Sequence, residues 1–317
     1  MSSSRHPIRE KLEWLAVRAG FAILPRLPRP WIVALSRGLG RLALMVSPKL
    51  RRIAEANLEV VFGTECPTEE RNRILRRSYQ SFALMLLDTF WFSRDTRERM
   101  ETWVDLAPDV NGIYEAGPRV CLTLHLGNWE VLGMAFQARG LPLASVANPL
   151  KNPSVDRLFI RHREKLGQKI IPRKGAARGI LKVLRDGEKI ALVMDQNTAP
   201  NEGGAFVDFF GIPATTSIVP AALALKTRAP IFMTCCIADA EGRYHTTPPL
   251  YLDLPDDLGT GENAAVTLTQ RLNHHMETVI RAHPEYWCWM YKRWKHRRKT
   301  MPANRFPFYT SVYHEPG

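Results

Sequence analysis

Residues 119–130 read Arg-Val-Cys-Leu-Thr-Leu-His-Leu-Gly-Asn-Trp-Glu, and their pattern is the strongest indication of the fold class. Its apolar run Val120–Leu124 predicts a short buried strand. The strand ends at His125, and after a Gly-Asn pair the pattern becomes helical through Trp129–Phe136. A buried strand that leads directly into a helix is typical of proteins in which helices cover a largely parallel sheet.

The same alternation continues along the chain. We expect elements at Leu143–Ala147 (strand), Asn152–Leu166 (helix), Lys169–Ile171 (strand), Ala176–Leu184 (helix) and Lys189–Met194 (strand). This order predicts an α/β fold with a mixed central sheet, much of it parallel, flanked by helices. Such sheets place their chemistry beyond the carboxyl ends of the strands, where His125 and Asp195 both lie.

The rest of the second half is less regular. Gln196–Ser217 is rich in Gly, Pro, Asn and Thr, which predicts a loop over the carboxyl edge of the sheet. Beyond it we expect a strand at Ile231–Ile237, a helix at Thr267–Ala282 and an irregular tail after Pro302.

The first 47 residues have a character of their own. Two apolar segments, Leu12–Leu24 and Trp31–Val46, carry Trp on one side and Arg on the other, and a proline-rich break separates them. Neither reaches the roughly 18–20 uninterrupted apolar residues of a spanning helix. We therefore divide the chain into a membrane-associating segment, 1–47, and a catalytic domain, 48–317. Two amphipathic helices packed on a soluble core are the alternative.

The charge of the chain suggests an anionic partner. The 317 residues carry a formal net charge of +13, which attracts nucleic acid, an anionic membrane or an acidic protein. No nucleic-acid module accompanies the basic stretch Lys292–Lys299, so we expect no nucleic-acid partner. Five cysteines without a CxxC pair argue against a disulfide framework or a zinc module, and we expect no metal.

His125 and Glu130 form the most informative pair of polar residues. The turn between them can bring the Glu130 carboxylate to one imidazole nitrogen, which leaves the other nitrogen free as a general base. Cys121 lies inside the apolar strand and no GxSxG motif is present, so the nucleophile would be a hydroxyl or amine of the substrate. The backbone N–H groups of Gly127 and Asn128 would meet the developing negative charge.

Three separate blocks carry a family resemblance. His125-Leu-Gly-Asn-Trp-Glu130 resembles the His-x4-Asp/Glu motif of the glycerolipid and lysophospholipid acyltransferase superfamily. Met194-Asp-Gln-Asn with Gly204-Ala-Phe-Val-Asp-Phe-Phe-Gly-Ile-Pro-Ala-Thr-Thr216, and His283-Pro-Glu-Tyr-Trp-Cys-Trp-Met-Tyr-Lys-Arg-Trp-Lys295, resemble the bacterial lipid A biosynthesis acyltransferases. With the similar N-terminal order, the resemblance covers nearly the whole chain.

The resemblance implies a glycerolipid acyltransferase-like fold with a membrane-associating N-terminus. It also implies direct transfer of a fatty acyl group from an acyl carrier protein thioester to a hydroxyl of a lipid A precursor, without an acyl-enzyme and without a cofactor. The partners would be acyl carrier protein, the lipid acceptor and the anionic surface of the inner membrane, at its cytoplasmic face. Coenzyme A is the alternative donor.

The resemblance also assigns roles to residues. His125 takes the general-base role and Glu130 the orienting role, while Asp195 matches a family aspartate. Arg161 is our preferred match to a family arginine, with Arg163 as the alternative. The expected substrate-binding set is Gly127, Asn128, Arg161, Arg163, Asp195 and Gln196. The sequence departs from the family where relatives often have His, because Tyr291 and Lys292 stand there.

The sequence is also compatible with other functions. Within the same chemistry, the acceptor is alternatively another glycolipid, a lysophospholipid or an aminolipid. A non-catalytic binding protein with this fold would not need His125. A metal hydrolase would need a third ligand beside His125 and Glu130, and none is evident nearby.

Overall fold

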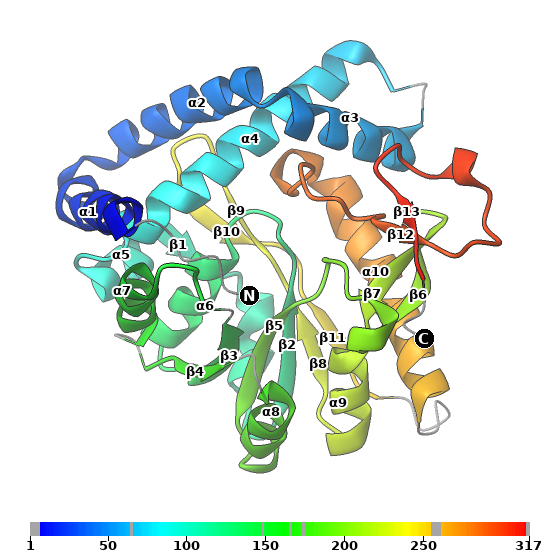
Figure 1. Cartoon of the computed structure of the whole chain (residues 1–317). Coiled ribbons are helices and arrows are strands. Elements are labelled where there is room, and N and C mark those ends of the chain that lie inside the picture. The colour runs from blue at the N-terminus through cyan, green and yellow to red at the C-terminus, as the bar shows by residue number, and fades with distance from the viewer. Residues whose placement is uncertain are drawn as a thin grey trace.

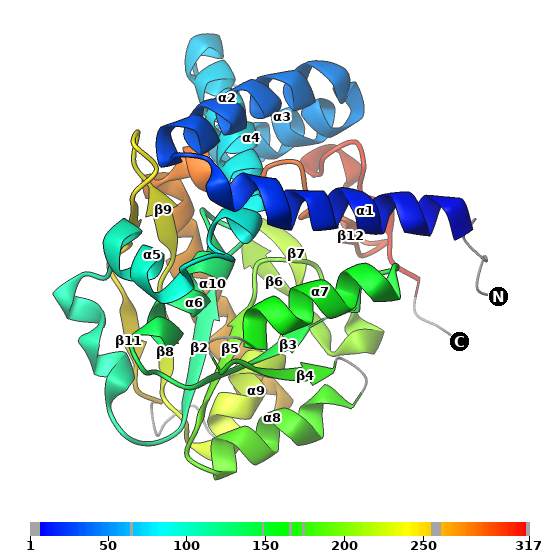
Figure 2. The same cartoon turned by 90° about the vertical axis from the view of Figure 1, so that its left-hand side faces the viewer.

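The computed structural model describes residues 7–63, 66–147, 149–164, 167–172, 175–254 and 261–314. Helices lie on both faces of a central sheet, and further helices run across one end of the molecule (Figures 1 and 2). The fold class expected from the sequence is confirmed.

The central sheet has the strand order β11-β8-β2-β5-β3-β4 in the described residues. All neighbours are parallel except β11, which runs antiparallel to β8. The strands are β2 (Arg119–Thr123), β3 (Leu143–Ala147), β4 (Lys169–Pro172), β5 (Lys189–Val193), β8 (Ile231–Met233) and β11 (Leu250–Leu252). Because Thr123 of β2 is in register with Val193 of β5, the residues just after these two strands lie side by side.

Alternation along β2 divides the core between the two faces of the sheet. Val120 and Leu122 belong to one buried cluster, which includes the apolar sides of α8 (Ala176–Arg185), α9 (Val219–Thr227) and α10 (Glu262–Ala282). Cys121 belongs to the other, with α5 (Thr96–Trp103) and α6 (Trp129–Ala138). Both faces are therefore apolar, which explains why the strand reads as an unbroken apolar run.

The N-terminal helices follow one another across one end of the molecule (Figure 1). They are α1 (Pro7–Ile23), α2 (Arg29–Val46), α3 (Pro48–Phe62) and α4 (Thr68–Trp91). Helix α2 packs along α4 so closely that a Cβ on Gly40 would lie 2.6 Å from the Cα of Gln80. No helix in the described residues has the length and apolarity needed to cross a membrane.

The expected loop at Gln196–Ser217 is wrong in part. Its second half is a β-hairpin of β6 (Gly204–Phe209) and β7 (Ile212–Ser217), antiparallel to each other. The β-branched and aromatic residues of these strands are strand formers, but the glycines and prolines around them obscured the pattern. The hairpin packs on α10, and its residues Val207 and Phe209 are buried.

Three other expectations are corrected. The strand expected at Ile231–Ile237 is two strands, β8 and β9 (Cys236–Ala238), and β9 joins a separate small sheet with β10 (Tyr244–Thr246) and β1 (Val104–Asp105). The tail after Pro302 contains β13 (Ser311–Val312), which pairs with β12 (His296–Arg297). The helix expected at Asn152–Leu166 is α7 (Pro153–Glu164), and Lys165 and Leu166 lie outside the described residues.

Candidate functional site

The site is centred on His125, which lies two residues beyond the carboxyl end of β2. Its imidazole Nδ1 lies 2.7 Å from Oδ1 of Asp195, the residue at the corresponding place after β5. The prediction that both residues lie at carboxyl ends of strands is confirmed, and the structure brings the two side chains into contact. The His125 ring is one-fifth exposed and packs edge-on against Trp129, with 4.6 Å between the ring centroids.

Asp195 is buried and receives several hydrogen bonds. The backbone N–H of His125 donates to its carboxylate at 3.1 Å, and the Trp287 indole N–H donates to Oδ2 at 2.8 Å. Burial alone would raise the pKa of Asp195, but His125 and these donors outweigh burial and lower it below its usual value.

The ionised carboxylate fixes the protonation pattern of the imidazole. A carboxylate only accepts hydrogen bonds, so Nδ1 of His125 must be the donor in this contact. In a neutral imidazole the other nitrogen, Nε2, then carries a lone pair. Nε2 lies 3.1 Å from the Gln196 amide nitrogen, which donates into that lone pair.

The predicted contact between Glu130 and the imidazole of His125 is wrong. The Glu130 carboxylate binds the Arg163 guanidinium in two bonds, of 3.0 and 2.5 Å, while Asp195 holds Nδ1 of His125. Proximity in the sequence favoured Glu130, but the parallel pairing of β2 and β5 brings a more distant carboxylate closer. Glu130 therefore contacts Arg163 rather than His125.

The two candidate arginines of α7 lie in different surroundings. Arg163 faces Glu130 in the first turn of α6, whereas Arg161 lines a surface depression of about 680 Å³. That depression lies between α1, α7 and the segment after α4, and its lining includes Arg18, Arg26 and Arg94. The structure therefore joins Arg163, and not our preferred Arg161, to the residues around His125.

The predicted donors Gly127 and Asn128 are already engaged. The Gly127 N–H donates to the carbonyl of Tyr286 at 3.0 Å, and the Asn128 N–H donates to the carbonyl of Cys236 at 2.8 Å. Both groups thus hold the turn in place, which corrects the expectation that they face the substrate. The Asn128 side chain caps α6 by accepting from the Val131 N–H at 3.0 Å.

The free donors of this turn lie one residue further on. Among the described residues, none accepts a hydrogen bond from the backbone N–H groups of Trp129 and Glu130. They belong to the first turn of α6, where N–H groups have no partner within the helix and carry partial positive charge.

Sequence reasoning missed the contribution of Trp287. The segment from Tyr286 to Cys288 runs under the His125 turn, because Cys288 N–H donates to the His125 carbonyl at 3.0 Å and Trp287 holds Asp195. The tryptophan-rich C-terminal segment was the sequence feature that could have indicated this contact. The same segment continues to Arg293, which is fully buried and donates to the Thr215 carbonyl at 2.9 Å, so this cation is not available to a membrane or carrier protein.

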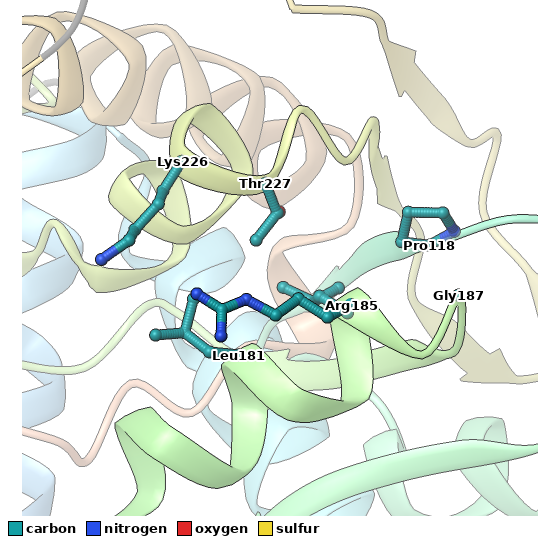
Figure 3. A pocket seen from close by; sticks show the side chains of 7 residues that line it. Pro118, Leu181, Arg185, Gly187, Lys226 and Thr227 are labelled. Atoms are coloured by element: carbon teal, nitrogen blue, oxygen red, sulfur yellow. The ribbon is translucent and has the colours of Figure 1, made fainter.

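Another pocket lies at the opposite end of the sheet. It has a volume of about 320 Å³ and is lined in part by Pro118, Arg185 and Lys226 (Figure 3). Pro118 precedes β2, so a whole strand, about 17 Å for five residues, separates this pocket from His125. In the described part of the chain, no three His, Cys, Asp or Glu side chains are placed to hold a metal ion.

Comparison with known proteins identifies the family. The model of the bacterial lipid A biosynthesis acyltransferases matches residues 2–296. The chain belongs to this family. It is therefore an acyltransferase, and the resemblance of its three sequence blocks is confirmed.

Two full-length relatives of this acyltransferase differ in the lipid that they are named for. The lipid A biosynthesis lauroyltransferase of Escherichia coli is 28% identical over 308 residues, which are 94% of this chain and 95% of the relative. The phosphatidylinositol mannoside acyltransferase of Mycolicibacterium smegmatis is 26% identical over 302 residues, 92% of this chain and 94% of the relative.

The Gly127 turn predicts a sharp steric limit. Gly127 has φ of +67°, and a Cβ there would lie 2.0 Å from the carbonyl oxygen of Cys236, so Gly127→Ala must move the backbone. We expect this variant to lose about 2 kcal/mol or more of unfolding free energy. Chemical denaturation measures the loss, with Gly133→Ala as control because its added Cβ meets nothing within 4 Å. Equal stability of the two variants would contradict the placement of this turn.

The Glu130–Arg163 pair predicts non-additive effects on activity. Glu130→Gln and Arg163→Gln each remove the same bidentate contact, so the double variant should lose little more activity than Arg163→Gln alone. A double-mutant cycle on the acyl transfer rate measures this coupling. Full additivity of the two losses would show that Glu130 acts independently of Arg163.

Proposed function

We propose that this acyltransferase moves a fatty acyl chain from the thioester of an acyl carrier protein to a hydroxyl of a lipid A precursor. His125 is the general base. The observation that carries this proposal is the buried Asp195–His125 contact, because it directs the unprotonated Nε2 of the imidazole away from the carboxylate.

The reaction needs one proton acceptor and no protein nucleophile. The acceptor hydroxyl takes the place of the Gln196 amide beside Nε2 and gives its proton to His125 as its oxygen attacks the thioester carbonyl. The ionised Asp195 stabilises the imidazolium. The tetrahedral intermediate then collapses, the C–S bond breaks, and the proton passes from His125 to the departing thiolate. General-base catalysis of this kind raises the reaction rate by about 10²–10⁴-fold.

Negative charge on the thioester oxygen requires donors near the imidazole. The free N–H groups of Trp129 and Glu130 occupy the start of α6, next to His125, where the partial positive charge of the helix is concentrated. Arg163, held by Glu130 in an ion pair, brings guanidinium N–H groups to the same turn. These groups replace Gly127 and Asn128 as the proposed donors.

A phosphorylated glycolipid suits the surroundings of the site. The arginine-lined depression formed by Arg18, Arg26, Arg94 and Arg161 opens next to α7, the helix that carries Arg163. Guanidinium groups bind phosphates well, and a lipid A precursor carries them. The mannoside relative favours a second candidate acceptor, a phosphoinositol glycolipid, with the same chemistry at the hydroxyl.

The exposed apolar surface of α1 and α2 supports association with a membrane. Four large apolar side chains on α1 and six on α2 are exposed. Those on α2 are Trp31, Leu35, Leu39, Leu42, Met45 and Val46, at the spacing of one helix face. The N-terminal segment 1–47 thus meets the lipid surface in this proposal, and the protein lies at the cytoplasmic face of the inner membrane, where carrier-bound acyl chains are available.

An acyl transfer assay tests the reaction. Wild-type protein should transfer label from acyl carrier protein to a lipid A precursor, and His125→Ala and Asp195→Asn should lower kcat by about 10²–10⁴-fold. Parallel reactions offer acyl coenzyme A as donor, and a phosphoinositol mannoside or a lysophospholipid as acceptor. Transfer only to one of the other acceptors would reassign the substrate. Unchanged kcat in folded His125→Ala would refute the mechanism.

A vesicle assay tests the membrane surface. Substituting Trp31, Leu42 and Met45 together by Ser should weaken binding to vesicles of phosphatidylethanolamine and phosphatidylglycerol by about tenfold or more, because three apolar side chains leave the lipid. Phe308→Ser is the matched control, since Phe308 is similarly exposed but lies in the C-terminal tail. If the control loses as much binding as the triple variant, the N-terminal surface is not the contact.

A further inference from the structure

A buried chain of hydrogen bonds leads from the His125 turn to the first residue of α2. The Asn128 amide nitrogen donates to the Tyr244 hydroxyl at 3.0 Å, and that hydroxyl donates to Oδ2 of Asp88 at 2.6 Å. Arg29 binds both oxygens of Asp88 and also donates to the Gly242 carbonyl at 2.5 Å. The four side chains come from the α6 cap, β10, α4 and α2.

Each bond in this chain has a fixed direction. The Asn128 oxygen accepts from the Val131 N–H, so the amide nitrogen faces Tyr244. The tyrosine oxygen accepts this bond and gives its own proton to the Asp88 carboxylate, which cannot donate. Turning the Asn128 amide over would break the cap of α6 and the bond to Tyr244 together.

The chain lies entirely in the interior. Asp88 is inaccessible to solvent, and Arg29, Tyr244 and Asn128 are at most 3% exposed. Arg29 is also enclosed by aromatic rings, with its guanidinium 4.7 Å from the ring centroid of Trp91. Buried polar groups are tolerated when every member has a partner, and they then hold a single arrangement of the elements that they join.

The acyl transfer reaction itself uses none of Arg29, Asp88 or Tyr244, and their burial keeps them from the substrate. Yet their chain of hydrogen bonds leads to Asn128. The side-chain oxygen of Asn128 caps the first turn of α6, which carries the free N–H groups of Trp129 and Glu130. A shift of this turn would move those donors relative to His125. Displacements of about 1 Å at a catalytic group can cost about 10²-fold in rate.

We propose that Tyr244 and Asp88 are positioning residues for the catalytic turn, with Arg29 of α2 fixing Asp88 in place. The proposal rests on the acyl transfer function argued above and adds a physical connection to it. Helix α2 presents its apolar face to the lipid and anchors its first residue in this chain. The helix that binds the membrane surface is therefore also a support of the catalytic turn.

The decisive variant is Tyr244→Phe, which removes one hydroxyl and both of its hydrogen bonds. We expect kcat to fall about tenfold or more while KM changes less than about twofold, because the substrate still meets the same surface. The pH dependence of kcat should keep its shape, since His125 and Asp195 retain their contact. Tyr114→Phe is the matched control, because the Tyr114 hydroxyl is buried and has no hydrogen-bond partner in the described part of the chain.

Amide hydrogen exchange gives a readout that does not depend on activity. In Tyr244→Phe the N–H of Val131 should exchange faster, since its acceptor on Asn128 is no longer held, while Tyr114→Phe should leave this rate unchanged. Failure of the wild-type protein to transfer acyl groups would count against the proposed function, and the exchange data would still test the positioning chain.

Arg29→Lys is the second variant, used if Tyr244→Phe does not fold. It keeps the positive charge but loses the bidentate contact with Asp88, so a severalfold loss of kcat with folding preserved is expected. Unchanged kcat and unchanged Val131 exchange in a folded Tyr244→Phe protein would overturn the proposal. Equal losses in Tyr114→Phe would also overturn it, because the effect would then come from removal of any buried hydroxyl.

Discussion

The structure depends on one buried carboxylate. Asp195 lies at the end of β5, accepts from the backbone and imidazole of His125 at the end of β2, and accepts from Trp287 in the C-terminal segment. A buried charge is costly unless it is paired, so these donors are also what keeps the carboxylate ionised. The same bonds join two central strands to a segment about ninety residues further along the chain.

The sequence predicted the sheet because its pattern is local. Short apolar runs alternating with helical segments identify β2, β3, β4 and β5 without knowledge of their pairing. The position of His125 and Asp195 at strand ends follows from the same pattern. The hairpin of β6 and β7 was missed because turn residues inside and around it outweighed its short strands.

The carboxylate that binds the His125 imidazole could not be identified from the spacing of residues along the sequence. A carboxylate five residues away along the chain is one candidate, but register in a parallel sheet places residues after neighbouring strands even closer. Such pairing is a tertiary property, and so are the backbone acceptors that engage Gly127 and Asn128. The sequence indicated which types of residue lie at the site. Which of these side chains contact one another depends on the fold.

The N-terminal segment contributes to the packed interior of the protein. Its outer side exposes apolar residues of α1 and α2, while Arg29 at the start of α2 is buried against Asp88. Removing the segment would leave the buried Asp88 without its positively charged partner. The unfolding free energy would then fall by more than the loss of a surface contact would cost. The division at residue 47 thus follows a change of sequence character, and the packing of α2 on α4 continues across it. In the proposed function the hydroxyl chemistry at His125 serves any lipid acceptor equally, so selection among acceptors falls to groups away from the imidazole. The arginines of the depression between α1 and α7 lie beside the helix that carries Arg163, so in the proposed function they bind a phosphate of the acceptor.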